Sequence, residues 1–145
     1  MTATTREVAE AWFDGLDRAD YASALGLLHP DIVWINVPQI KDGSDIIPWI
    51  GTARGLDEVN LQFSRRDGVC KVKEVKCVGM VCEGNTAVGL VRDKATIIKT
   101  NTDFEIVFAS WMTIENGKIV RWKSYCDTAP IIAAFKGIEP PTPEL

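Results

Sequence analysis

The order of the predicted elements constrains this chain most, because helical segments come first and β-rich segments follow. The second half contains four segments rich in Val, Ile, Phe, Thr and Trp, near residues 70–80, 86–98, 103–115 and 118–127. Asn116-Gly117, between the last two, is typical of a two-residue hairpin loop in which positive φ angles are needed. We therefore expect consecutive antiparallel strands in this half.

The first half shows helical periodicity. Apolar residues recur at helical spacing from Val8 to Leu16, and Asp20 can cap a second helix that runs to Leu28 and is ended by His29-Pro30. The other elements that we expect are a strand over 32–37, a helix from 56 to about 65 and a short helix over 129–135.

Helices followed by a strand meander are an α+β pattern. We expect a cone-shaped, curved, mixed or antiparallel sheet wrapped around the N-terminal helices, with a pocket between the two layers. A chain of 145 residues is long enough to bury one core, so we expect a single domain over residues 1–138 and a flexible tail over 139–145. The segment 38–55 reads as a loop with large apolar residues, which either covers the mouth of the pocket or plugs the end of the core.

Composition argues against several classes of partner. The net charge of −4 disfavours nucleic acids and anionic membranes, and no window has the roughly 20 apolar residues of a membrane span. The N-terminus lacks the apolar core of a signal peptide, so we expect a cytoplasmic protein. The four cysteines contain no Cys-x-x-Cys pair and His29 is the only histidine, so we expect free thiols and no metal site.

Known phosphate-binding and hydrolase motifs are absent from the sequence, so we expect no cofactor. Three places could carry acid–base chemistry. Asp127 ends a long strand and either faces a cavity or caps the following helix. Arg92 and Lys94 share one strand face, which is either the cavity wall or a solvated outer face. Trp34 and Asn36 also share one strand face. They either form an aromatic wall and an amide of the cavity or belong to the ordinary core.

Two stretches resemble SnoaL-like polyketide cyclases and limonene-epoxide hydrolases, which belong to the nuclear transport factor 2-like (NTF2-like) superfold. The first runs from His29 through Trp34 and Pro38 to Pro48-Trp-Ile-Gly51 and Gly55, and the second is Glu115–Asp127. The resemblance covers about residues 5–136. It implies the cone-shaped fold, and it implies the reaction less specifically, because this superfold hosts cyclases, isomerases, hydrolases and binding modules.

The resemblance to the hydrolases also implies roles for individual residues. Their water-activating carboxylate falls on Asp127, their bridging arginine on Arg92 and their water-holding asparagine on Asn36. Their water-binding tyrosine falls on Trp34, and their proton-donating aspartate falls on Lys94. Two cations around one carboxylate would keep that carboxylate ionised, as a base for proton transfer at carbon.

The residues that we expect to be catalytic are therefore Asp127, Arg92 and Lys94. Those that we expect to bind the substrate are Trp34, Asn36, Trp49, Trp111 and Tyr125. The function that this set predicts is cyclisation or isomerisation of a hydrophobic, oxygenated small molecule, a polyketide or terpenoid of secondary metabolism. Epoxide hydrolysis and non-catalytic ligand binding are the alternatives. The resemblance further implies a homodimer that pairs through the outer face of the sheet.

Overall fold

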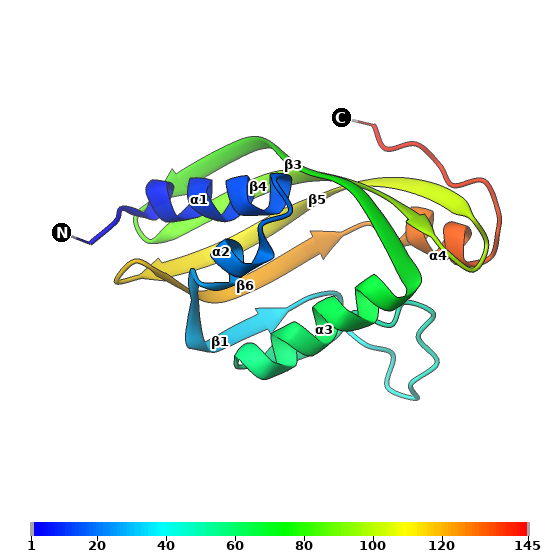
Figure 1. The fold of residues 1–145 in the computed structure, drawn as a ribbon, viewed down its shortest axis with the longest axis horizontal. Coiled ribbons are helices and arrows are strands. Elements are labelled where there is room, and N and C mark those ends of the chain that lie inside the picture. The colour runs from blue at the N-terminus through cyan, green and yellow to red at the C-terminus, as the bar shows by residue number, and fades with distance from the viewer. Residues whose placement is uncertain (1, 145) are drawn as a thin grey trace.

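Within residues 2–144, which the computed structural model describes, six strands form one mixed sheet in the order β2-β1-β6-β5-β4-β3 (Figure 1). The strands are β1 (Leu28–Ile35), β2 (Thr52–Arg54), β3 (Cys70–Glu83), β4 (Thr86–Ile97), β5 (Thr102–Glu115) and β6 (Lys118–Cys126). β1 and β6 pair in parallel, and all other neighbours are antiparallel. The expected α+β fold with a curved sheet is confirmed.

The helices lie on one face of the sheet and at one of its ends (Figure 1). They are α1 (Thr5–Asp17), α2 (Tyr21–Leu25), α3 (Leu56–Val69) and α4 (Ala129–Phe135). Asp20 caps α2 as expected, because its carboxylate accepts the backbone N–H of Ser23. None of the helices within residues 2–144 is long and apolar enough to cross a membrane.

The boundary between α2 and β1 differs from the prediction. The second helix ends at Leu25, and β1 begins at Leu28, so His29 and Pro30 lie in a strand. The pairing of β1 with β6 shifts register between Leu28 and Val33, and proline is tolerated at such an irregularity because no ladder hydrogen bond is required there. The helical periodicity of this segment is a local signal. The strand forms because it pairs with β6, which is far away in the sequence.

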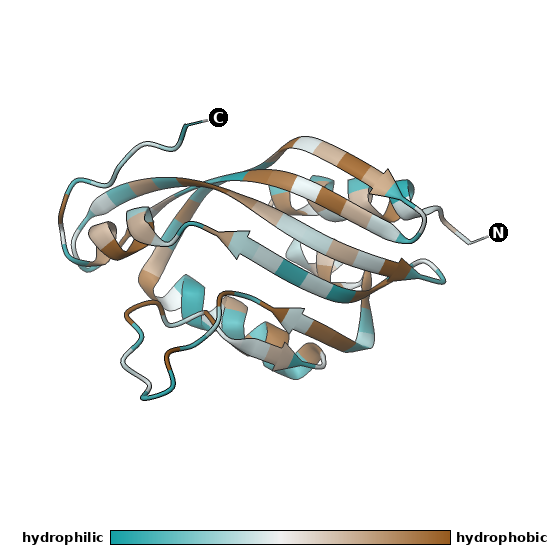
Figure 2. Ribbon diagram, turned by 180° about the vertical axis from the view of Figure 1, so that it is seen from behind, coloured by the Kyte–Doolittle hydropathy of each residue, from teal (hydrophilic) through white to brown (hydrophobic). Residues whose placement is uncertain are grey.

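The sheet curves because several strand pairs contain bulges. β3 shifts register against β4 twice, between Val72 and Glu74 and between Cys77 and Gly79. β5 and β6 shift at Thr113/Ile114. Each bulge increases the local bend of its strand, and the sheet is concave towards α1 and α3 (Figure 1). Hydropathy alternates along the strands when the sheet is seen from behind (Figure 2), as expected for a sheet with one buried face.

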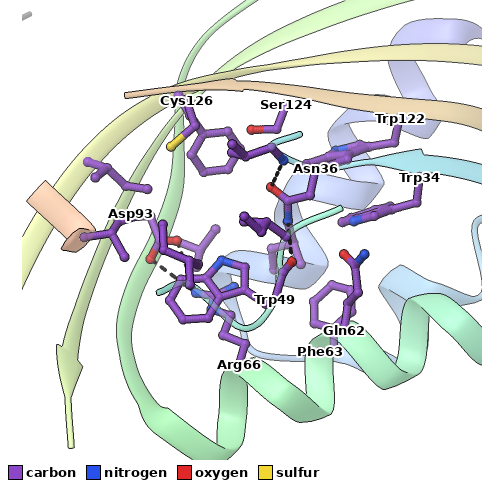
Figure 3. Close-up of a pocket in the computed structure, with 18 of the residues that line it drawn as sticks. Trp34, Asn36, Trp49, Gln62, Phe63, Arg66, Asp93, Trp122, Ser124 and Cys126 are labelled. Atoms are coloured by element: carbon purple, nitrogen blue, oxygen red, sulfur yellow. Dashed lines mark hydrogen bonds and ion pairs between the residues drawn. The ribbon is translucent and has the colours of Figure 1, made fainter. Parts of the chain in front are cut away.

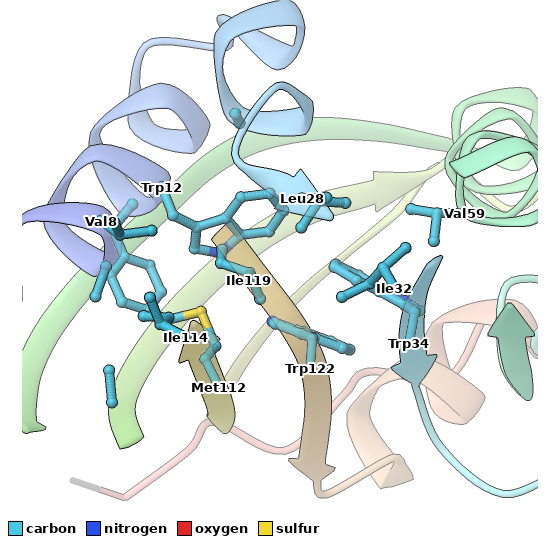
Figure 4. Close-up of a cluster of buried hydrophobic side chains, with 14 of the residues drawn as sticks. Val8, Trp12, Leu28, Ile32, Trp34, Val59, Met112, Ile114, Ile119 and Trp122 are labelled. Atoms are coloured by element: carbon cyan, nitrogen blue, oxygen red, sulfur yellow. The ribbon is translucent and has the colours of Figure 1, made fainter. Parts of the chain in front are cut away.

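The interior consists of two apolar clusters. One lies under α1 and contains Trp12, Ile32, Met112 and Trp122 (Figure 4). The other lies at the α4 end of the sheet and includes the buried side chains Ile47, Ile50, Ile97, Phe104 and Ile131. Phe108 packs against both clusters. The space between the clusters is where the candidate site lies.

Candidate functional site

A pocket opens between the two core clusters, with walls from the sheet, from α3 and from the loop before β2 (Figure 3). Its volume is about 840 Å³ when the open space at its mouth is counted. Its lining includes Trp12, Leu16, Tyr21, Trp34, Asn36, Val37, Ile47, Trp49, Ile50, Gln62, Phe63, Arg66, Val75, Asp93, Phe104, Ile106, Phe108, Trp122, Ser124, Cys126 and Ile131. Most of these side chains are apolar, so the pocket suits a hydrophobic molecule.

Aromatic rings form one end of the pocket. Trp34 of β1 stacks on Trp122 of β6, with ring centroids 3.7 Å apart and planes within 8° of parallel. Phe63 of α3 lies 5.7 Å from the Trp34 ring, and Trp12 of α1 meets that ring edge-on at 5.8 Å. Four elements thus contribute rings to one wall, which provides flat, rigid surfaces for an aromatic or cyclic ligand.

Asp93 and Arg66 form an ion pair in this apolar pocket (Figure 3). Asp93 lies in the middle of β4, and Arg66 reaches it from the last turn of α3. One guanidinium nitrogen, Nη2, is 3.3 Å from Oδ1 and 3.2 Å from Oδ2. The side chains are only 10% exposed for Asp93 and 17% for Arg66. Burial raises the pKa of Asp93, and the positive charge of Arg66 limits the rise.

A carboxyl group with these properties is suited to proton transfer. A raised pKa makes the carboxylate a stronger base than an exposed aspartate and brings its titration closer to neutral pH. Perturbed carboxyl groups in apolar clefts are frequent at functional sites.

The other polar side chains of the pocket are amides and hydroxyls. The Asn36 amide is already held by the backbone, because its Nδ2 donates to the carbonyl of Trp49 and its Oδ1 accepts the N–H of Val37. Gln62 lies on α3, one turn before Arg66. Burial raises the pKa of Tyr21, so its hydroxyl stays protonated. These groups provide hydrogen bonds inside an otherwise apolar space.

Two thiols flank the ion pair. Burial raises the pKa of Cys70 to about 11 and that of Cys126 to about 12. Both thiols are therefore neutral at physiological pH and act as small apolar groups there.

Three of the residues expected to bind substrate line the pocket. Trp34, Asn36 and Trp49 all lie in its wall. Trp111 and Tyr125 do not, because they point from the outer face of the sheet and are 43% and 55% exposed. The ring of Tyr125 instead makes a cation–π contact with Lys123, whose Nζ lies 4.9 Å from the ring centroid.

The expectation that Arg92 and Lys94 line the pocket is wrong. Both lie on the outer face of β4, where Arg92 pairs with Glu74 at 3.0 Å and Lys94 lies 3.7 Å from Glu105. Strand alternation explains the error, since Arg92 and Lys94 share one face and Asp93 between them takes the other. The prediction had the alternation right and the assignment of the inner face wrong.

Asp127 lies outside the lining and is exposed. Its Oδ1 accepts the backbone N–H of Ala129, the first residue of α4, at 3.1 Å, although the N-cap position expected for Asp127 is taken by Thr128. Every second residue of β6 points into the pocket, namely Trp122, Ser124 and Cys126. The residues between them point to the outer face of the sheet. The structure therefore does not bring Asp127, Arg92 and Lys94 together in one cavity.

Sequence reasoning missed Asp93, Arg66 and Gln62. A signal for Asp93 existed, because it shares strand parity with Val91, Ala95 and Ile97, whereas Arg92 and Lys94 share parity with Leu90 and Thr96. One acid in an otherwise apolar inward series indicates a buried functional group. Arg66 and Gln62 lie on a helix with weak apolar patterning, and no comparable signal marks them.

Sequence comparison gives one match. Residues 9–122 match the model of the SnoaL-like domain family, which is well over half of the chain. No curated protein matches this sequence.

Solved structures are similar over nearly the whole chain. An NTF2-like protein from Burkholderia thailandensis is 25% identical, with 91% of this chain and 97% of that chain covered and a TM-score of 0.79. TerC, co-crystallised with polyporic acid, is 19% identical, with coverage of 91% and 98% and a TM-score of 0.77. An LEH-like epoxide hydrolase from Mycobacterium tuberculosis is 20% identical, with coverage of 94% and 90% and a TM-score of 0.66. At these identities the last two similarities concern the fold alone.

Proposed function

Because the chain belongs to the SnoaL-like domain family and has the NTF2-like fold, we propose that it is a cofactor-free acid–base enzyme acting on a hydrophobic, oxygenated small molecule. Asp93 transfers the proton. One observation carries this proposal: within residues 2–144, Asp93 is the one carboxylic acid that lines the pocket, and it is buried against Arg66. Burial of an acid costs folding free energy because the acid loses its hydration. Acids buried in this way are frequent at functional sites.

The proposed reaction begins with ionised Asp93. Its carboxylate takes a proton from a carbon next to a carbonyl group, and the electron pair moves onto the carbonyl oxygen as an enolate. In isomerisation, Asp93 returns the proton to a different carbon and the double bond moves. In cyclisation, the enolate carbon attacks a second carbonyl carbon of the same molecule, and Asp93 protonates the resulting alkoxide. Asp93 ends each cycle ionised, as it began.

Arg66 supports this chemistry by position and charge. Its contact with both carboxylate oxygens fixes the orientation of Asp93 towards the pocket. Its charge keeps the pKa of Asp93 from rising as far as burial alone would take it, and so favours the ionised form that acts as the base.

The lining favours proton transfer at carbon over epoxide hydrolysis. Epoxide opening of the limonene-epoxide hydrolase type uses one carboxylate as base and a second, protonated carboxyl as acid. The lining residues within 2–144 provide Asp93 for one of these roles and no second acid. Reaction in water labelled with heavy oxygen distinguishes the two chemistries, because hydrolysis puts the label into a diol and isomerisation or cyclisation does not.

Hydrogen–deuterium exchange tests the role of Asp93 directly. 2-Tetralone is a flat, apolar ketone with an acidic C–H, and NMR in deuterium oxide follows the exchange at that carbon. We expect the protein to accelerate exchange and Asp93→Asn to lose at least about a hundredfold of that acceleration, while quenching of tryptophan fluorescence shows that the ketone still binds.

Asp127→Asn is the matched control, because Asp127 is an exposed aspartate outside the pocket. It should leave the exchange rate unchanged. Exchange by Asp93→Asn at the wild-type rate would contradict the proposed role. Binding of the ketone without any acceleration by the wild-type protein would favour a non-catalytic binding module instead.

We also propose that the protein is a homodimer that pairs through the outer face of its sheet. Exposed apolar side chains on that face support this, among them Val81, Leu90, Trp111 and Tyr125. The strand register places Leu90 opposite Ala109 and Ala109 opposite Tyr125, so these residues form one row across three strands.

A further inference from the structure

Gln62 presents an unpaired hydrogen-bond acceptor inside the pocket. Its side chain is only 7% exposed and belongs to the pocket lining. Its Nε2 donates to the carbonyl oxygen of Gly51 at 3.1 Å. Because that carbonyl can only accept, the amide orientation is fixed and Oε1 is directed away from it. Oε1 is buried and has no partner within residues 2–144.

An unpaired buried acceptor is costly and therefore rare. More than about 90% of buried polar groups in folded proteins have a hydrogen-bond partner, because an unpaired one loses its hydration without compensation. In Figure 3 the Gln62 amide lies beside Trp34 among the side chains that line the pocket. A donor group on a molecule bound beside this amide would pair with Oε1.

We propose that Oε1 of Gln62 accepts a hydrogen bond from a hydroxyl or N–H group of the bound substrate and so determines which substrates the pocket selects. The assignment builds on the proposed function of the pocket. It adds one requirement to the substrate, because a hydrophobic molecule with carbonyl oxygens alone could not satisfy Gln62.

Gln62 lies on the same face of α3 as Arg66, which pairs with Asp93. Gln62 and Arg66 are four residues apart on α3, so their Cβ atoms are about 5–6 Å apart on the same helix face. Arg66 holds Asp93. The Gln62 amide and the Asp93–Arg66 pair therefore belong to the same pocket lining.

A pair of probes that differ only in the donor tests this requirement. 2-Naphthol carries a hydroxyl group, and 2-methoxynaphthalene is the same ring system with that donor blocked. Dissociation constants for both are measured at pH 7 by quenching of tryptophan fluorescence, for the wild-type protein and for Gln62→Leu. We expect Gln62→Leu to raise the dissociation constant of 2-naphthol, relative to that of 2-methoxynaphthalene, by roughly three- to tenfold.

The ratio separates recognition from structural support. Loss of the bond from Gln62 to Gly51 loosens the loop for both probes and cancels in the ratio. Phe63→Leu is the matched control, because Phe63 is the neighbouring lining residue on α3 and its side chain has no hydrogen-bonding group. It should weaken both probes by the same factor.

The outcomes distinguish this inference from the proposed function. Binding of both naphthalenes with the same ratio in wild-type protein and Gln62→Leu overturns the role of Gln62 and leaves the pocket as a ligand site. Failure of the wild-type protein to bind either naphthalene overturns both. A change of ratio in Phe63→Leu as large as that in Gln62→Leu also counts against Gln62, because it would place the selectivity in the apolar walls.

Discussion

Asp93 experiences two opposing influences, and their balance determines when it is charged. Removal from water favours the neutral acid, whereas the guanidinium of Arg66 favours the carboxylate. The pKa is raised, so desolvation is the larger effect. Arg66 therefore does not neutralise the cost of burying this acid, and the remaining cost is consistent with a group kept for its chemistry.

The raised pKa of Asp93 predicts how stability depends on pH. Above pH ~4 the unfolded chain loses the Asp93 proton, while the folded protein retains it until the pH passes the raised pKa. The free energy of unfolding of the wild-type protein should therefore fall relative to that of Asp93→Asn as the pH rises through this window, and the difference should become constant above it. Urea unfolding of both proteins across the window measures the difference.

The comparison isolates Asp93, because the two proteins share every other titrating group. A difference that stays constant across the window would mean that the pKa of Asp93 is not raised. A difference that grows in favour of the wild-type protein would mean that the Arg66 pair outweighs burial.

Sequence alone located some of the site residues and misplaced others for an identifiable reason. Trp34, Asn36 and Trp49 line the pocket as expected. Arg92 and Lys94 were assigned by similarity to a motif, and the assignment chose the wrong face of β4. Apolar parity along the strand was the better guide, because burial determines which face is inside regardless of family.

At the scale of elements, close packing of α1 on β4 positions one end of the pocket. The ring of Phe13 on α1 lies directly over Gly89 of β4, and a Cβ added to Gly89 would be 2.1 Å from a ring carbon. α1 also supplies Trp12 and Leu16 to the lining. Glycine at this strand position therefore permits a helix approach that places two lining residues.

Substitution at Gly89 should cost stability through this contact. Gly89→Ala must displace the Phe13 ring, and overpacking of this kind costs about 1–3 kcal/mol. Gly79→Ala on the neighbouring strand is the control, because its nearest neighbour would be the Leu90 Cβ at 4.0 Å. Thermal or urea unfolding of both variants measures the costs, and equal stabilities for the two would show that α1 is free to move.

Local patterning predicted most elements, and distant pairing determined the rest. The hairpin at Asn116-Gly117 forms as expected, with positive φ at both residues. The short strand β2 within the predicted loop was missed, because three residues carry too little pattern and pairing with β1 creates the strand. Ile47 and Ile50 of the loop before it belong to the second core cluster and also line the pocket.

At the scale of the molecule, the pocket exists because the curved sheet is too long for one core. α1 covers one end and α4 the other, which leaves two apolar clusters with space between them. The loop before β2, α3 and the middle of the sheet enclose that space. The order of elements predicted such a pocket between layers, whereas its ion pair joins Asp93 of β4 to Arg66 of α3, a contact that no local pattern reveals.

The outer face of the sheet should carry the contact between two copies of the chain. Trp111 is exposed there, and the register places it opposite Val88 on β4 and Lys123 on β6. An apolar face of this kind is usually covered by a partner. A second copy fits this face because Arg92 and Lys94 lie beside Glu74 and Glu105. The face therefore carries positive and negative side chains that can pair with those of an identical surface.

Substitution of Trp111 tests this arrangement. Light scattering coupled to size-exclusion chromatography should give the wild-type protein twice the 16.0 kDa of one chain and give Trp111→Arg a single chain's mass, because the substitution puts like charges face to face across the interface. Leu61→Arg removes a comparably exposed apolar residue from α3, away from this face, and should remain dimeric. A monomeric wild-type protein, or a dimeric Trp111→Arg, would contradict pairing through the outer face. Because Asp93 and Arg66 lie on the opposite side of the sheet, the monomeric variant should keep its proton-exchange activity, which would place the complete site within one chain.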